Sequence, residues 1–160
     1  MYLIDSDVLI DAKNRHYGFD IVPGFWRWLE RAHDDGRVFT VERVSQEVLA
    51  GKDELADWMA ARPASFILKP TPADQAALQT VAEWANAAPY RPGVAAGFLG
   101  VGDYFLVSQA STLGFTVVTQ EVPAPLSKSK LKIPDACAAV RVAWMSPFEM
   151  LRREHAQFNL

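Results

Sequence analysis

Short apolar runs alternate along the chain with longer segments in which apolar residues recur every three or four positions. The short runs are rich in β-branched and aromatic residues, which favours strands, and the longer spacing favours amphipathic helices. The predicted strands are 2–5, 37–41, 65–68, 115–119 and 140–144. The predicted helices are 8–12, 25–32, 44–49, 53–61, 72–87 and 103–113, with a last one starting after Ser146. Strands that alternate with helices predict an α/β fold, with a mostly parallel sheet flanked by helices on both faces.

Capping and breaking residues refine this pattern. Thr71 before Pro72 is typical of a helix start, and the Ser-Pro-x-Glu sequence beginning at Ser146 matches a capping box. Residues 89–102 are rich in glycine and proline, so we expect an irregular, mobile loop over a site. Residues 123–134 predict a second loop, which carries several lysines.

Length and composition set the broad class. The chain has 160 residues, half of them hydrophobic, which suits one compact domain over 1–160. Its one cysteine, Cys137, excludes an internal disulfide, and we expect a buried thiol in a reducing compartment. Asp5 and Asp7 fall where a signal peptide would need apolar residues, and apolar runs are too short for a membrane span. We therefore expect a cytoplasmic protein without a membrane partner.

Several acidic residues follow a predicted strand or lie in the helix after it, and these positions fall at one edge of the predicted sheet. Ligand sites of such folds lie beyond the carboxyl ends of the strands. Acids that follow a strand, or occupy the helix after it, can meet at that edge although they are far apart in sequence. The candidates are Asp5 with Asp7 nearby, Glu47, Asp103 and Glu121. Taken singly, Asp103 is as readily a helix cap and Glu47 a solvated helix residue.

A gathered set of carboxylates has one plain chemical use. Unpaired carboxylates repel one another and their pKa values rise, whereas a hard divalent cation relieves the repulsion. Mg²⁺ and Mn²⁺ prefer carboxylate and water oxygens. A cation held in this way can support deprotonation of a water and neutralise charge on a phosphate, which suits phosphodiester hydrolysis.

Net charge is a weak argument against a nucleic-acid partner, because the chain carries −3 overall. Setting aside the four candidate metal-site acids gives −3 + 4 = +1, which leaves a near-neutral surface with room for basic clusters. His16, His33 and His155 are too scattered in the sequence to suggest a metal set of their own.

Several motifs resemble those of the PIN domain family. Residues 3–10 (LIDSDVLI) are similar to the family's opening strand and aspartate, and 45–49 (SQEVL) to the helix with its second acid. Residues 102–110 (GDYFLVSQA) and 114–121 (GFTVVTQE) resemble its later helix and the strand that follows. A narrower likeness, to a PIN-like subfamily without an assigned function, lies in 12–17, in 23–29 and in the Ile-Pro-Asp-Ala-Cys at 133–137.

The resemblance implies a single PIN-like domain and an endoribonuclease that uses Mg²⁺ or Mn²⁺. Such enzymes are often the toxin of a bacterial type II toxin–antitoxin pair, which implies RNA as substrate, a protein antitoxin as partner and a possible homodimer. Carried over by position, the catalytic and metal-binding acids are Asp5, Glu47, Asp103 and Glu121. Two residues depart from the family pattern: Asp7 stands where many members have Asn, and Glu121 where many have Asp.

Residues around these acids supply supporting and substrate-binding candidates. Ser6, Asp7 and Thr119 are placed to support the metal ligands, the two hydroxyls by hydrogen bonding. The basic stretch after the first motif would contact substrate phosphates, although a solvated charged turn explains it equally well; it comprises Lys13, Asn14, Arg15 and His16. Lys128, Lys130 and Lys132 could line an RNA path, but a solvated loop is the simpler interpretation.

Trp26 and Trp28 cannot share one face of a helix, so one is expected in the core. Core packing is the simpler interpretation for the other as well, and a dimer or antitoxin interface is the alternative.

Two other functions remain open. Asp5-Ser6-Asp7 after an apolar strand is also similar to haloacid-dehalogenase-like phosphatases, although Leu9 and the absence of a later Asp-Asp pair depart from that pattern. The third possibility is a non-catalytic module that binds RNA or protein. Retention of all four acids argues against it, because a buried acid cluster without a role only destabilises the fold.

Overall fold

The sheet places the first strand of the chain at its centre. The computed structural model describes residues 1–158, so residues 159 and 160 of the predicted domain lie outside the described part. All strand pairs are parallel, in the order β3-β2-β1-β4-β5. The strands are β1 (Tyr2–Ile4), β2 (Val38–Val41), β3 (Ile67–Leu68), β4 (Thr116–Val118) and β5 (Trp144–Met145). Leu3 pairs with Phe39 of β2 on one side and with Val117 of β4 on the other. The predicted α/β class with a parallel sheet is confirmed.

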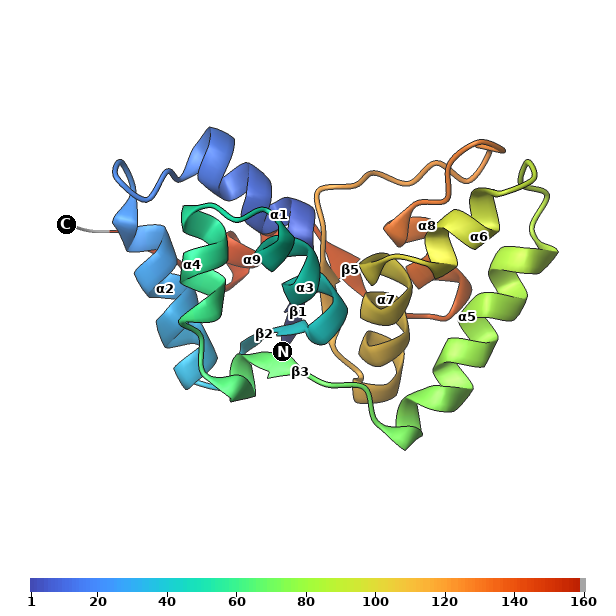
Figure 1. Cartoon of the computed structure of the whole chain (residues 1–160), viewed down its shortest axis with the longest axis horizontal. Coiled ribbons are helices and arrows are strands. Elements are labelled where there is room, and N and C mark those ends of the chain that lie inside the picture. The colour runs from blue at the N-terminus through green and yellow to red at the C-terminus, as the bar shows by residue number, and fades with distance from the viewer. Residues whose placement is uncertain (159–160) are drawn as a thin grey trace.

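Helices cover both faces of this sheet (Figure 1). The α-helices are α1 (Ser6–Asp11), α2 (Pro23–Asp34), α3 (Glu42–Ala50), α4 (Glu54–Ala60), α5 (Gln75–Ala87), α6 (Val94–Leu99), α7 (Gly102–Leu113), α8 (Ile133–Ala139) and α9 (Pro147–Arg153). A π-helical turn, Ala12–His16, extends α1, and 3₁₀ turns span Ala64–Phe66 and Pro72–Asp74.

Alternate strand residues feed two separate hydrophobic cores. Tyr2 and Ile4 of β1 pack into the core beneath α1, α2, α4 and α9, whereas Leu3 packs into the core beneath α5, α7 and α8. Val118 and Val117 of β4 divide in the same way. This is the two-residue period of a strand that is buried on both faces. The sheet edge at the carboxyl ends of β1, β2 and β4 is thereby held rigidly between two packed layers.

Three stretches differ from the sequence expectation. The glycine-rich 89–102 region is not a plain loop, because it contains α6, whose Phe98 is 5% exposed in the second core. The predicted last strand, 140–144, is displaced: α8 ends at Ala139, and only Trp144 and Met145 pair with β4. Of the predicted strand 65–68, only Ile67 and Leu68 pair with β2.

Trp26 and Trp28 of α2 are both buried, so core packing is confirmed for both and neither is exposed for a partner. Trp26 is 3% exposed and stacks on Phe19 at a ring-centroid distance of 4.0 Å. Trp28 is 6% exposed, and the Arg37 guanidinium lies 5.9 Å from its ring centroid. The core is wide enough here to cover two faces of the helix. Cys137 is fully buried as predicted, and burial raises the pKa of its thiol to about 12.

None of the helices within residues 1–158 is long and apolar enough to cross a membrane.

Candidate active site

Asp5 lies directly beyond the carboxyl end of β1 and is almost completely buried, with 2% of its surface exposed. Thr119, at the end of the neighbouring strand β4, donates a hydrogen bond from Oγ1 to Asp5 Oδ2 at 3.0 Å. Ser6 Oγ lies 3.4 Å from Asp5 Oδ1. The parallel pairing of β1 with β4 brings these residues together, so both predicted supporting hydroxyls contact a predicted acid.

Glu47 reaches the same place from α3. Its Oε2 accepts a hydrogen bond from Ser6 Oγ at 3.0 Å, so the single hydroxyl proton of Ser6 is placed better for Glu47 than for Asp5, which is 3.4 Å away. Its Oε1 accepts from the backbone N–H of Gly102, the first residue of α7, at 2.7 Å. A Cβ atom on Gly102 would stand 2.9 Å from that oxygen, which is too close. Glycine at this position is therefore what allows the carboxylate to approach the backbone.

Asp103 follows Gly102 in the first turn of α7 and completes the group on this side. Its pKa is raised to about 7, chiefly by burial and then by the charges of Glu121, Glu47 and Asp7. The pKa of Asp5 is raised well above its usual value by burial, and next by Asp103 and Asp7. The predicted acids therefore lie close enough together to disfavour one another's charge.

Asp7, in the first turn of α1, belongs to the same electrostatic group but is more open to solvent. Its pKa is raised by partial burial and by the charges of Glu121, Asp11 and Glu47, while Lys132 lowers it. The aspartate at this position therefore adds negative charge to the acid site.

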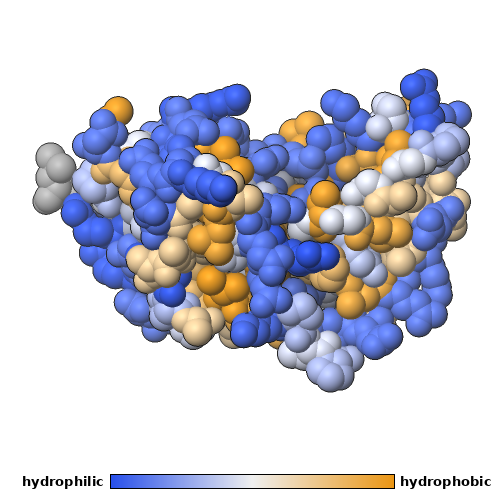
Figure 2. Space-filling model, in the orientation of Figure 1, coloured by the Kyte–Doolittle hydropathy of each residue, from blue (hydrophilic) through white to orange (hydrophobic). Residues whose placement is uncertain are grey.

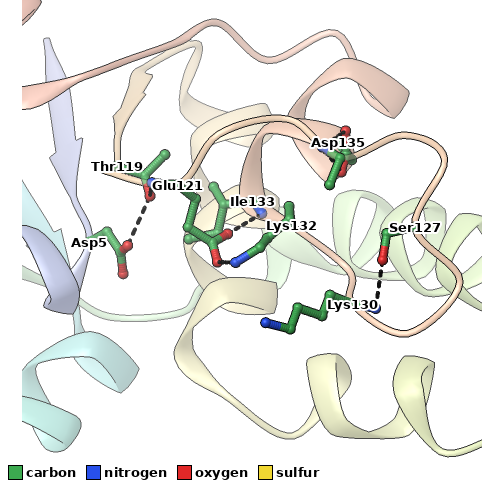
Figure 3. Close-up of polar contacts among 9 residues, drawn as sticks. Asp5, Thr119, Glu121, Ser127, Lys130, Lys132, Ile133 and Asp135 are labelled. Carbon is green, nitrogen blue, oxygen red and sulfur yellow. Dashed lines mark hydrogen bonds and ion pairs between the residues drawn. The ribbon is translucent and has the colours of Figure 1, made fainter.

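Glu121 is held by groups of its own chain. Lys132 Nζ lies 2.6 Å from Oε1, and the backbone N–H of Ile133 donates to Oε2 at 2.7 Å (Figure 3). The pKa of Lys132 is raised, first by its hydrogen bond to Glu121 and also by the charges of Asp103 and Asp7. A lysine side chain thus lies within the group of acids, at the start of α8.

Two contacts of the site were not predicted from the sequence: Gly102 with Glu47, and Lys132, considered only for an RNA path, with Glu121. Pro134 is typical of a helix start, where free N–H groups attract a carboxylate such as Glu121, and Lys132 directly precedes that start. Gly102 stands directly before a candidate acid at the start of a predicted helix, where the backbone approaches other groups closely.

The basic stretch after the first motif lies in the π-helical turn, where most of its side chains have partners. Lys13 forms an ion pair with Asp53, and Arg15 Nε lies 3.5 Å from Asp11 Oδ1. The His16 ring packs edge-on against Phe148 at 5.7 Å. Asn14 is exposed. Substrate phosphates would therefore have to compete with these intramolecular partners at Lys13 and Arg15.

Two open cavities flank the start of α7, beside the acids. One, of about 290 Å³, is lined by Asp103, Lys130 and Lys132 together with residues of α6. The other, of about 250 Å³, is lined by Arg43, Glu47 and Gly102. The face in Figure 2 is hollowed at its upper edge, between the side that carries α1 and the side that carries α6. The acid group is therefore reachable from solvent.

Comparison with protein families gives one match. A family described as "Domain of unknown function (DUF4411)" matches residues 2–158. The chain belongs to the DUF4411 family. No curated protein and no solved structure matches it. The matched range of this DUF4411 chain includes every strand and every candidate acid.

The side chains of the DUF4411 site are of the type that binds a hard divalent cation. The side chains offer carboxylate oxygens. The pKa values of Asp5 and Asp103 are raised first by burial and then by the charges of neighbouring acids, and a cation would offset both effects. Within residues 1–158, no three His, Cys, Asp or Glu side chains are already gathered to hold an ion. Asp5, Glu47 and Glu121 each accept hydrogen bonds from donors of the chain, so a cation would share their oxygens with these donors.

Proposed function

We propose that this chain is an endoribonuclease that depends on Mg²⁺ or Mn²⁺ and hydrolyses RNA phosphodiester bonds. The observation that carries the proposal is the convergence of Asp5, Glu47, Asp103 and Glu121 at one sheet edge, where burial and shared charge raise the pKa of two of them. The similarity of the surrounding motifs to those of PIN domains supports the same reaction.

The acid group is unfavourable without a cation. Burial of Asp5 costs free energy, and the charges of the neighbouring acids add to that cost. A protein that keeps such a group gains from a bound cation. When bound, Mg²⁺ or Mn²⁺ would support deprotonation of a water and neutralise charge on the phosphate. Asp5, Glu47, Asp103 and Glu121 would hold the ion.

The other residues orient these carboxylates. Thr119 fixes the Asp5 side chain, and Ser6 together with Gly102 fixes Glu47. Such hydrogen bonds to metal ligands set the orientation of the ligand oxygens. Lys132 keeps Glu121 next to the start of α8 and brings a positive charge toward the place where a phosphate would lie.

The biological setting follows from the PIN resemblance. We infer that the enzyme acts in the cytoplasm as the toxin of a type II toxin–antitoxin pair. A protein antitoxin and a second copy of the chain are then the expected protein partners.

The deciding experiment is RNA cleavage by the purified full chain in Mg²⁺, Mn²⁺ or EDTA. Asp5→Asn removes a central carboxylate charge with little change in shape, and Asp34→Asn, an exposed aspartate at the end of α2, is the matched control. We expect cleavage by the wild type and by Asp34→Asn in metal only, and none by Asp5→Asn.

The alternatives predict other results in the same assays. Hydrolysis of a phosphomonoester such as p-nitrophenyl phosphate, without RNA cleavage, would favour the haloacid-dehalogenase-like reaction. Failure to cleave RNA, together with no Mn²⁺ binding by calorimetry, would leave a non-catalytic RNA- or protein-binding module.

A further inference from the structure

One cavity in the described part of the chain lies apart from the acids. It measures about 560 Å³ and opens between the end of α5, the segment 125–128 and α8. Its aromatic lining consists of Trp84 and Tyr90, whose ring centroids are 6.3 Å apart, and both side chains are half-buried. Lys128 and Asp135 contribute polar groups to the same lining. The proposed hydrolysis uses none of these residues.

One stretch of chain connects this cavity with the acid site. Residues 125–128 line the aromatic cavity, and residues 129–132 line the 290 Å³ cavity that contains Asp103. The backbone N–H of Arg91 donates to the Lys128 carbonyl at 2.7 Å, which fixes the segment between the two cavities. Ser127 Oγ also accepts from the Lys130 backbone N–H at 3.1 Å. The two cavities therefore follow one another along a segment that the fold holds in place.

Lysines mark this path at alternate positions. Lys128 lines the aromatic cavity, and Lys130 and Lys132 line the cavity beside Asp103. Figure 3 shows the Lys130 and Lys132 side chains extending from the segment to the same side, toward Glu121. Lys132 is paired with Glu121, whereas Lys130 is exposed. Lys132, Lys130 and Lys128 thus lie one after another between the acids and the aromatic cavity. This arrangement favours a ligand with regularly spaced negative charges and flat apolar groups.

We propose that residues 125–132 form a binding track for single-stranded RNA, with a base held in the Trp84–Tyr90 cavity and a backbone phosphate on Lys130. The proposal rests on the proposed nuclease function and extends it to the strand that leaves the acid site. Aromatic rings bind unstacked bases of any sequence, and lysines track the phosphates. A base in a duplex is stacked on its neighbours and cannot enter such a cavity. The track therefore selects single strands.

The test measures binding without cleavage. A labelled 2′-O-methyl RNA decamer is titrated with the full chain in EDTA, and the anisotropy is followed at several salt concentrations. We expect Trp84→Leu to weaken binding about tenfold, as loss of one stacked base would, and Trp84→Phe to retain most of it. Lys130→Gln should lower the slope of log K against log salt by about 0.7. Lys69→Gln, an exposed lysine before α5, is the control and should change neither quantity.

Tyr90→Leu serves as a second cavity variant if Trp84→Leu fails to fold, and thermal melting reports folding of each variant. A DNA decamer of the same sequence and an RNA hairpin form the comparison arms. We expect the hairpin and the DNA decamer each to bind more weakly than the single-stranded RNA decamer.

Two results would overturn the track. Equal RNA affinity of wild type and both folded cavity variants would remove the base site, and an unchanged salt slope in Lys130→Gln would remove the phosphate site. If Trp84→Leu changed the self-association of the chain relative to the wild type and left its RNA affinity unchanged, the cavity would be assigned to a second copy of the chain. The nuclease proposal is tested separately: cleavage that persists in Trp84→Leu and Lys130→Gln, with equal binding, would contradict the track alone.

Discussion

Among single residues, Asp103 contributes to the response of the fold to pH, as do Asp5 and Asp7, whose pKa values are also raised. The folded pKa of Asp103, about 7, lies above the ordinary value of 3.8, so the native state binds more protons than the unfolded state between these values. Stability therefore falls as the pH rises from about 4 through 7 in the absence of metal. The cause is burial among other acids, since the charged form is the one that the site disfavours.

We predict that the metal-free protein melts at a lower temperature at pH 8 than at pH 5.5, and that Asp103→Asn flattens this dependence. At pH 8 the full pKa shift corresponds to about 4 kcal/mol; since Asp103 is partly open to solvent, we expect the variant to gain on the order of 1–3 kcal/mol. Thermal melts in EDTA across the pH range measure this. A pH profile of Asp103→Asn parallel to that of the wild type would contradict it.

A second prediction concerns the effect of a side chain at Gly102 on metal affinity. In Gly102→Ala the new methyl group would stand 2.9 Å from Glu47 Oε1 and displace the carboxylate from the backbone N–H. We expect Mn²⁺ affinity to fall about tenfold or more, as on loss of a residue that orients a ligand. Gly97→Ala is the control, because a Cβ there meets nothing within 4 Å. Calorimetric titration of both variants with Mn²⁺ gives the comparison, and equal affinities would show that Glu47 is not held for the ion.

The residues found from sequence and those missed differ in one physical respect. Asp5, Ser6 and Thr119 were predictable, because strand ends in a parallel sheet converge and their polar residues follow with them. Lys132 and Gly102 act through a contact with another segment, Glu121 in one case and Glu47 in the other. Such contacts depend on how α7 and α8 pack against the rest of the fold, which the spacing of residues along the sequence does not determine.

At the scale of elements, the start of α8 and the segment before it keep Glu121 in place. Lys132 and the Ile133 N–H bind its two oxygens, and both residues of the ion pair are mostly covered, with side chains 26% and 18% exposed. Breaking this pair therefore costs more stability than breaking an exposed surface pair.

We predict that Lys132→Met lowers the free energy of unfolding of the metal-free protein by about 1–2 kcal/mol at pH 8, because Glu121 is left unpaired near other acids. Lys132→Arg should retain most of the stability, and Lys69→Met serves as the exposed control. Urea unfolding in EDTA measures each variant. No difference between Lys132→Met and Lys69→Met would mean that the pair does not hold this segment.

Elements were predictable from sequence where a local pattern and a tertiary partner agreed. β1, β4, α2 and α9 have both a clear period or cap and a place in a core. The helix α6 was missed because glycines surround it, and burial of Phe98 outweighs their low helix propensity. The final strand was misplaced because Val140 and Val142 look like strand residues yet pack in the second core around α8.

At the scale of the whole molecule, a bound cation should stabilise the entire fold, since the acids come from α1, α3, α7 and the ends of two central strands. We predict that Mn²⁺ at about one hundred times its dissociation constant adds about 2.7 kcal/mol, and raises the melting temperature more at pH 8 than at pH 5.5, where protons compete for Asp103. Melting curves with and without Mn²⁺ measure both effects, and Asp5→Asn should respond little. A rise of equal size in Asp5→Asn would place the ion elsewhere.

The hydrogen bond between Asp5 and Thr119 joins residues 114 positions apart. The strand at the centre of the sheet thus leaves the ribosome long before β4, which completes both its pairing and its acid site. Until then the nascent chain carries the early carboxylates apart from the later ones, without their mutual repulsion. Under the proposed function, RNA cleavage could therefore begin only after β4 and the acid that follows it, Glu121, have been synthesised.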